Sequence, residues 1–206
     1  MASEYSPSND SVISPEPILA DAFVMDGVVD RLAAGLYNLA SMLVGEGDDS
    51  VRLVETAIAN TDVSACEDPD QARISGRRSL CEGALDILRL HNAGGLAAPE
   101  GLKASGNCID EDDLDAVEIA REDLERMSSG PDRERVRDWL AGLPTALRTI
   151  FVLRAVAGLS AAETAAMLEK RGGPEAAGWN AEAVRSVFRE GLCSLASQLL
   201  HATSAR

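Results

Sequence analysis

The chain is poor in several kinds of residue that mark particular classes of protein. Only two of its 19 basic residues are lysines, aromatic residues make up 3% of the sequence, and no apolar run approaches the roughly 18 residues of a membrane-spanning helix. The first residues also lack the basic start and apolar core of a signal peptide. We therefore expect a cytoplasmic protein that is not attached to a membrane.

Residues that usually carry metal sites or catalysis are scarce and scattered. The cysteines form no CxxC pair, and neither histidine has a cysteine beside it. The cysteines are Cys66, Cys81, Cys108 and Cys193, and the histidines are His91 and His201. This spacing favours free thiols in a reducing compartment over a zinc or redox site. Because no catalytic triad, carboxylate pair or phosphate-binding glycine loop stands out either, we expect neither an enzyme nor a bound cofactor or metal.

Acidic residues outnumber basic ones by 34 to 19, so the formal net charge is −15. Such a chain lacks the basic surface of a protein that binds nucleic acid on its own. The charge is uneven, however. Residues 1–109 contain 17 acids and 7 bases, residues 110–138 contain 12 and 5, and residues 139–206 contain 5 and 7. Only the C-terminal third has a positive balance.

The N-terminal part of the chain predicts a tail followed by a helical bundle. Residues 1–17 are polar and contain three prolines, which predicts a disordered tail. Within residues 18–92, apolar residues recur at spacings of three and four from Ile18 to Leu43. Two further helices are predicted over Asp49–Asn60, with Val51, Val54 and Ile58 facing inward, and over Gln71–Leu90.

Residues 93–131 predict an acidic linker between two helical units. The segment opens with glycines and a proline, and the acidic run from Asp110 to Asp115 then begins a pattern with helical spacing. Acidic residues suit a helix N-terminus, so an acid-capped linker helix is favoured, and a dedicated partner-binding segment stays the alternative. With a second unit over residues 132–206 and no strand pattern, we expect an all-α fold of two small helical domains.

The second unit has the start and stop signals of three successive helices. Pro144 suits the beginning of one helix, and Gly158 ends it. Ser160 and Glu163 have the spacing of a capping box, and the short helix that follows them is rich in alanine. Such small residues let another helix cross closely, as the first helix of a helix-turn-helix requires. Asn180 can cap the last and longest helix.

Two arginines stand four residues apart on the predicted last helix. Arg185 and Arg189 therefore share one helix face, from which both could reach a major groove or phosphates. Equally, they could be solvated arginines paired with Glu182 and Glu190. Their spacing alone does not decide between the two interpretations.

The sequence LPTALRTIFVLRAVAGLSAAETAAMLEK at residues 143–170 resembles domain four of the bacterial extracytoplasmic-function (ECF) sigma factors. The LP pair, the RxxFxLR-like core, the GLS turn and the ExA helix occur in the order typical of that domain. LVGEGDDSVRLVE at residues 43–55 and ALDILR at residues 84–89 are similar to the start and the end of domain two. The resemblance covers residues 23–200 and identifies the chain as a divergent member of this family.

The resemblance implies a subunit of RNA polymerase rather than an enzyme. Domain two of such factors docks on the polymerase clamp and melts the upstream edge of the transcription bubble, and domain four reads the upstream promoter element. Promoter reading is implied for Asn180, Arg185, Ser186 and Arg189. Polymerase docking is implied for Asp48, Asp49, Leu53 and Glu55. Melting and downstream readout are implied for Arg73, Arg77, Arg78, Asp86 and Arg89. The implied partners are core RNA polymerase, promoter DNA and an anti-sigma factor.

The chain also departs from the family pattern. Val51 and Arg52 follow Asp49, where the family usually has an acidic pair, and Ser75 and Gly76 stand where an aromatic residue usually stacks on the melted strand. The predicted turn of the helix-turn-helix is longer than the usual turn of about three or four residues. Few bases on the last helix mean weak, salt-sensitive binding to isolated DNA.

These departures leave two alternatives to a sigma factor. The first is a degenerate sigma-like adaptor or decoy that binds an anti-sigma factor without reading promoters. The second is a helix-turn-helix protein that uses Arg185 and Arg189 on DNA without polymerase.

Overall fold

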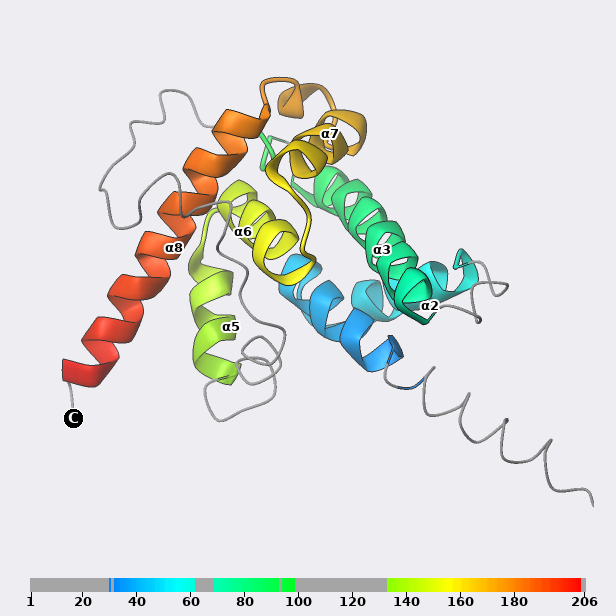
Figure 1. Cartoon of the computed structure of the whole chain (residues 1–206), viewed down its shortest axis with the longest axis horizontal. Helices are drawn as coiled ribbons and strands as arrows, with labels where there is room; N and C mark the ends of the chain where they lie inside the picture. The colour runs from blue at the N-terminus through cyan, green and yellow to red at the C-terminus, as the bar shows by residue number, and fades with distance from the viewer. Residues whose placement is uncertain (1–29, 31, 62–68, 93, 99–132, 205–206) are drawn as a thin grey trace, which may run out of the picture.

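The computed structural model describes residues 30, 32–61, 69–92, 94–98 and 133–204 (Figure 1). All regular secondary structure in these residues is helical, which confirms the predicted all-α class. None of the described helices combines the length and the apolar character needed to cross a lipid bilayer. The predicted tail, the acidic run and nearly all of the predicted linker lie outside the described residues.

Three helices make up the N-terminal half, by which we mean the described residues up to 98. They are a helix over residues 32–44, α2 (Asp48–Ala59) and α3 (Pro69–His91). Their apolar stripes meet in a core, and a Cβ on Gly83 of α3 would lie only 2.8 Å from Cδ2 of Leu53 on α2. The glycine therefore lets α2 and α3 cross closely.

The prediction for the inward face of α2 is wrong at one residue. Val51 is 46% exposed, whereas Leu53 and Ala57 are buried. Together with Val54, they form a stripe at positions i, i+1 and i+4 of the helix, as expected of a short helix with one face in a core. The prediction followed the spacing of three and four among Val51, Val54 and Ile58. Leu53 and Ala57, which are four apart, fit the same periodicity on the neighbouring face.

The C-terminal half, residues 133–204, contains four α-helices and two short helical turns. They are α5 (Arg133–Gly142), α6 (Thr145–Phe151), the π-helical turn η3 (Val152–Val156), α7 (Ala161–Arg171), the 3-10 turn η4 (Pro174–Ala176) and α8 (Ala181–Ser204). As predicted, α6 begins directly after Pro144. Gly158 follows η3 with a φ of 75°, a left-handed conformation that favours glycine and turns the chain toward α7.

Three of the chain's few aromatic residues form the centre of the C-terminal half. The rings of Trp139 and Phe151 meet edge to face with centroids 4.9 Å apart, and the Phe151 and Phe188 centroids are 5.8 Å apart. Gly191 lets α8 approach this cluster, because a Cβ there would lie 2.9 Å from Cδ2 of Phe151. The cluster joins α5, α6 and α8 into one unit.

The two halves contact one another along α3 and α7 (Figure 1). The side-chain amide of Asn92 donates a hydrogen bond to Oγ1 of Thr145 over 3.0 Å, at the end of α3. Arg137 of α5 forms an ion pair with Glu46, in the turn before α2. The sequence predicts two helical units, but its periodicity carries no information about these contacts between them.

Candidate helix-turn-helix interface

The beginning of α7 is fixed by the predicted capping box. Oγ of Ser160 accepts a hydrogen bond from the backbone N–H of Glu163, and the Ser160 N–H donates to Oε2 of Glu163 over 2.9 Å. The Ser160 backbone N–H and its Oγ–H both donate to the Glu163 carboxylate, and these two hydrogen bonds lower the pKa of Glu163, helped by the charge of Arg78 and opposed by burial. The box satisfies N–H groups that the first turn of a helix otherwise leaves unpaired.

Replacing Ser160 with alanine should lower the free energy of unfolding by about 1 kcal/mol. Because the pKa of Glu163 is lowered in the folded state, the box contributes fully above the ordinary carboxyl pKa of about 4.3 and fades as the pH falls below it. Urea unfolding at neutral pH and at about pH 3 should therefore show a difference that shrinks in acid. Ser197→Ala, at an exposed position of α8, is the control. Equal stability of both variants at neutral pH would contradict the capping role.

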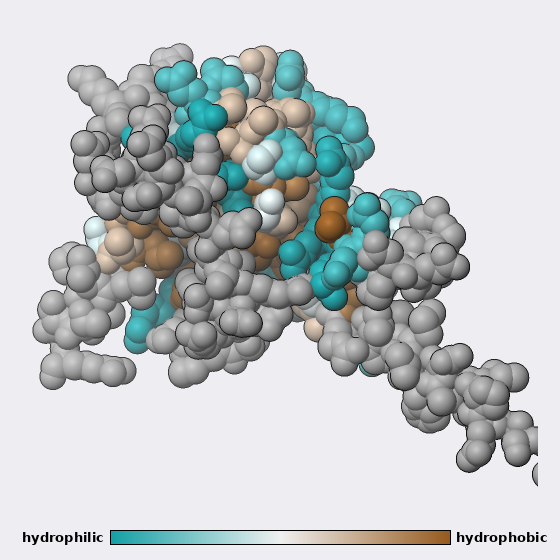
Figure 2. All heavy atoms as spheres, viewed as in Figure 1, coloured by the Kyte–Doolittle hydropathy of each residue, from teal (hydrophilic) through white to brown (hydrophobic). Residues whose placement is uncertain are grey.

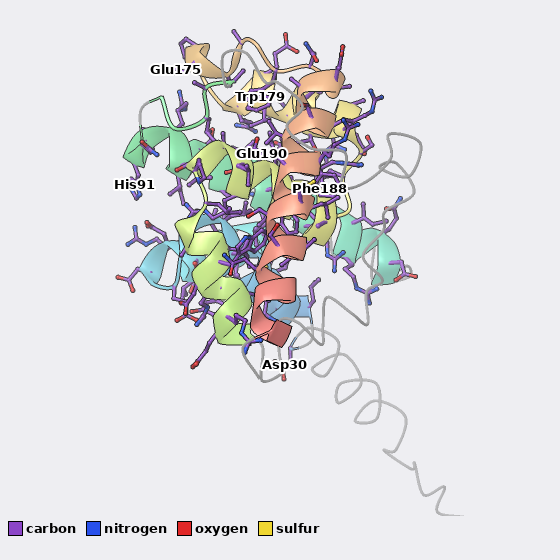
Figure 3. All side chains as sticks on the ribbon, turned by 90° about the vertical axis from the view of Figure 1, so that its left-hand side faces the viewer. Asp30, His91, Glu175, Trp179, Phe188 and Glu190 are labelled. Carbon is purple, nitrogen blue, oxygen red and sulfur yellow. The ribbon has the colours of Figure 1, made fainter. Side chains whose placement is uncertain are left out.

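The connection between α7 and α8 (residues 172–180) is long, as the sequence indicates, and it belongs to the described residues. Trp179 near its end is only 6% exposed, and its Nε1–H donates a hydrogen bond over 2.7 Å to the carbonyl oxygen of Leu96 in the N-terminal half (Figure 3). Asn180 then caps α8, since its Oδ1 accepts from the N–H of Ala183. The connection is thus anchored at Trp179.

The residues predicted to read a promoter lie together on the first turns of α8. Arg185, Ser186 and Arg189 are half-buried, whereas Glu182 and Glu190 are exposed. Figure 3 labels Phe188 and Glu190 on this helix, of which Phe188 is buried and Glu190 exposed. The structure therefore keeps the predicted set on one element, close to the turn that connects it to α7.

Two further arginines, Arg148 and Arg154, lie near α8, although the sequence identified them only as parts of the RxxFxLR-like core. Cζ of Arg154 lies 5.1 Å from the centroid of the Phe188 ring, and its Nη1 donates to the carbonyl oxygen of Leu159. Arg148 on α6 is half-buried, and burial lowers its pKa. Both stand on elements next to α8, so the positive charge of this half extends beyond α8. The sequence feature that could have pointed to both arginines is their position in the RxxFxLR-like core.

The residues implied in promoter melting all lie on α3 but form no single patch. Arg73 pairs with Asp70 over 2.7 Å, within the first turns of the helix. Arg78 and Asp86 instead face α7, where each has an ion-pair partner. Gly76 is buried, and a Cβ there would lie 3.3 Å from Oγ1 of Thr61, so an aromatic side chain has no room at that position.

Two further residues of that set differ in their surroundings. Arg77 is half-buried beside the thiol of Cys81, and Arg89 is exposed near the end of α3. Cδ of Arg89 lies against Gly173 of the α7–α8 connection. The connection therefore reaches the part of α3 that the family resemblance associates with DNA.

The residues implied in polymerase docking divide into exposed and buried ones. Asp48 and Glu55 are exposed on α2, and Oδ2 of Asp49 lies 3.8 Å from Nδ1 of His91 at the end of α3. Leu53 is 5% exposed and packs against Gly83. In this structure Leu53 is a core residue, and the acidic side chains are the ones that a partner can touch.

Two described cysteines have different states. Cys81 is a free thiol with no exposed surface, and burial raises its pKa to about 12. Cys193 is disulfide-bonded, so the expectation of free thiols is wrong at that position. Cys66 and Cys108 lie outside the described residues.

Comparison of the chain with protein-family models, curated proteins and solved structures finds no match.

Proposed function

We propose that this chain is an alternative sigma factor, which binds core RNA polymerase and directs promoter recognition and transcription initiation. One observation carries the proposal: the capped helix α7 and the long helix α8 pack together, and the first turns of α8 bear Arg185, Ser186 and Arg189. Such a packed pair supports the proposal, because a helix-turn-helix presents its second helix to a major groove.

The charges on the two halves suggest different partners for them. Arginine can donate two hydrogen bonds to a guanine edge or bind phosphate, so Arg185 and Arg189 would provide readout or positioning. Two arginines on α8 give a small counterion-release contribution, so polymerase would have to supply most of the affinity for DNA. The exposed acids Asp48 and Glu55 on α2 would pair with a basic surface of polymerase.

Run-off transcription with core polymerase and a library of upstream sequences tests this function. Each of Arg185→Ala and Arg189→Ala should reduce specific initiation by about 5- to 150-fold, since a bidentate contact contributes about 1–3 kcal/mol. Arg185→Lys is the matched control for charge, because lysine keeps the charge but loses the two-pronged geometry. Association with core polymerase should be the same for all variants. Unchanged initiation by both alanine variants would contradict promoter reading by α8.

The adaptor function is the second candidate, and one observation favours it. Arg78 and Asp86, which the resemblance assigns to melting, are engaged in ion pairs with α7. An adaptor would bind polymerase or an anti-sigma factor without initiating transcription. The same assay separates the candidates, since polymerase binding without initiation supports the adaptor. Sequence-specific DNA binding in the absence of polymerase would support the third interpretation, an autonomous helix-turn-helix protein.

A further inference from the structure

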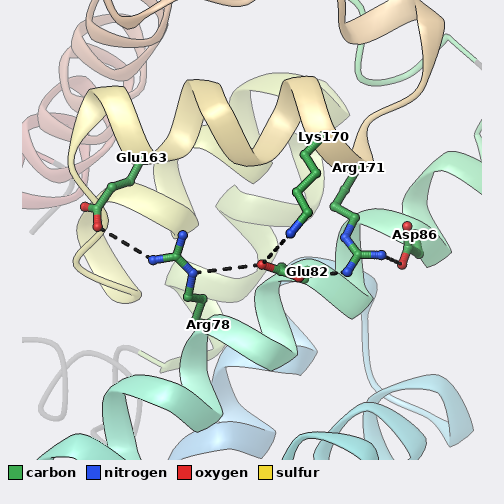
Figure 4. Close-up of polar contacts among 6 residues, drawn as sticks. All are labelled: Arg78, Glu82, Asp86, Glu163, Lys170 and Arg171. Atoms are coloured by element: carbon green, nitrogen blue, oxygen red, sulfur yellow. Dashed lines mark hydrogen bonds and ion pairs between the residues drawn. The ribbon is translucent and has the colours of Figure 1, made fainter. Parts of the chain in front are cut away.

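The contact between α3 and α7 consists of opposite charges in matching order (Figure 4). The α3 residues that take part in the ion pairs are positive, negative and negative in chain order, and their α7 partners are negative, positive and positive. The facing pairs are Arg78 with Glu163 at 3.9 Å, Glu82 with Lys170 at 3.7 Å and with Arg171 at 2.8 Å, and Asp86 with Arg171 at 3.3 Å. Like charges would oppose one another if either helix were shifted by one pair, so the charges fix the register of the two helices.

Glu82 is the centre of this contact. Its carboxylate accepts a hydrogen bond from Nη2 of Arg171 and lies within ion-pair distance of Lys170 and of Arg78 on its own helix. Burial alone would raise the pKa of Glu82, but the hydrogen bond from Arg171 and the three positive charges lower it. The charged form of Glu82 is therefore stabilised when α3 and α7 are in contact.

The α7–α8 connection provides the second part of the contact. Trp179 donates to Leu96, and Gly173 lies so close to Arg89 that a Cβ would be 2.9 Å from Cδ of Arg89. Gly173 has a φ of 82°, which a side chain would strain. The connection thus has glycine where both the backbone conformation and the close approach to α3 demand it.

We propose that Lys170, Arg171 and the connection over residues 172–180 form a latch, which closes on the acidic face of α3 and on residues 94–98. The long connection between α7 and α8 then binds the N-terminal half of the chain rather than DNA. The ion pairs of the latch are partly exposed, so each is weak and is screened by salt. While it is closed, Arg78 and Arg89 face the C-terminal half. Opening of the latch frees Arg78 and Arg89 for another ligand, and this part of the inference rests on the proposed function.

The two tryptophans offer a direct test of the latch in the full chain, without polymerase or DNA. The indole N–H of Trp179 donates across the two halves, whereas that of Trp139 donates over 3.1 Å to Oγ of Ser194 within the C-terminal half. Hydrogen exchange of both indole groups, followed by NMR, therefore reports on latch opening and on unfolding of the C-terminal half separately. The test variant is Glu82→Gln with Asp86→Asn, and the control is Glu169→Gln with Glu182→Gln, two exposed acids on α7 and α8.

Exchange at Trp179 should be about tenfold faster in the test variant than in the unaltered chain, because three ion pairs with α7 are lost. Exchange at Trp139 should not change, and the control variant should match the unaltered chain at both groups. Raising the salt from about 0.1 M to 1 M should remove most of the difference, because salt screens the pairs. Equal acceleration of both indoles, or no acceleration at Trp179, would overturn the latch. Neither result would bear on promoter recognition, which is measured separately.

Discussion

Replacing Trp179 with alanine is expected to lower the free energy of unfolding by about 3–5 kcal/mol. The side chain is 6% exposed, so its removal leaves a cavity between the α7–α8 connection and residues 94–98. The substitution also leaves the carbonyl oxygen of Leu96 without the donor that it has now, which adds a desolvation cost. Urea unfolding followed by far-ultraviolet circular dichroism measures the change, because it does not depend on tryptophan fluorescence.

Trp179→Phe is the matched control for this prediction. Phenylalanine keeps most of the apolar contact but cannot donate a hydrogen bond to Leu96, so the expected loss is about 1–2 kcal/mol. An ordinary surface aromatic would behave differently, since surface substitutions usually change stability by at most about 0.5 kcal/mol. A loss of that size for Trp179→Ala would show that Trp179 does not anchor the connection.

Phe151→Ala should destabilise the chain by a comparable amount, about 3–5 kcal/mol, for a different reason. Phe151 is 3% exposed and contacts the rings of Trp139 and Phe188, so its loss opens the centre of the C-terminal half. The substitution also removes the ring that α8 approaches closely at Gly191. Thermal and urea unfolding both measure this change.

Leu90→Ala is the control for Phe151→Ala, because it removes apolar atoms from a side chain that is 74% exposed. Its free energy of unfolding should stay within about 0.5 kcal/mol of that of the unaltered chain. If Leu90→Ala lowered the free energy of unfolding as much as Phe151→Ala, this would contradict the claim that the aromatic cluster forms the core of the C-terminal half.

The helices and their caps could be predicted from the sequence because they depend on nearby residues. Ser160 and Glu163 are three residues apart, and Asn180 caps the N–H of Ala183, so the signals for α7 and α8 are local. The break at Gly158 follows from its left-handed backbone. For the same reason, the sequence placed Arg185 and Arg189 on one helix face.

The contacts between the halves could not be predicted in the same way. Arg171 and Glu82 are 89 residues apart in sequence, and Trp179 and Leu96 are 83 apart. Periodicity shows which face of a helix is apolar, but it does not show which charged face will meet which other one. The burial of Leu53 is a related case, since the family resemblance implies a docking role for this residue and periodicity near it did not show that the core of this chain covers its side chain.

The most direct test of the proposed function is run-off transcription by core polymerase with the unaltered chain and a library of upstream sequences. We expect initiation from a defined subset of those sequences, and we expect Arg185→Ala and Arg189→Ala each to reduce it by about 5- to 150-fold while binding to polymerase persists. Binding to polymerase without initiation from any sequence, or no binding to polymerase at all, would contradict the assignment as a sigma factor.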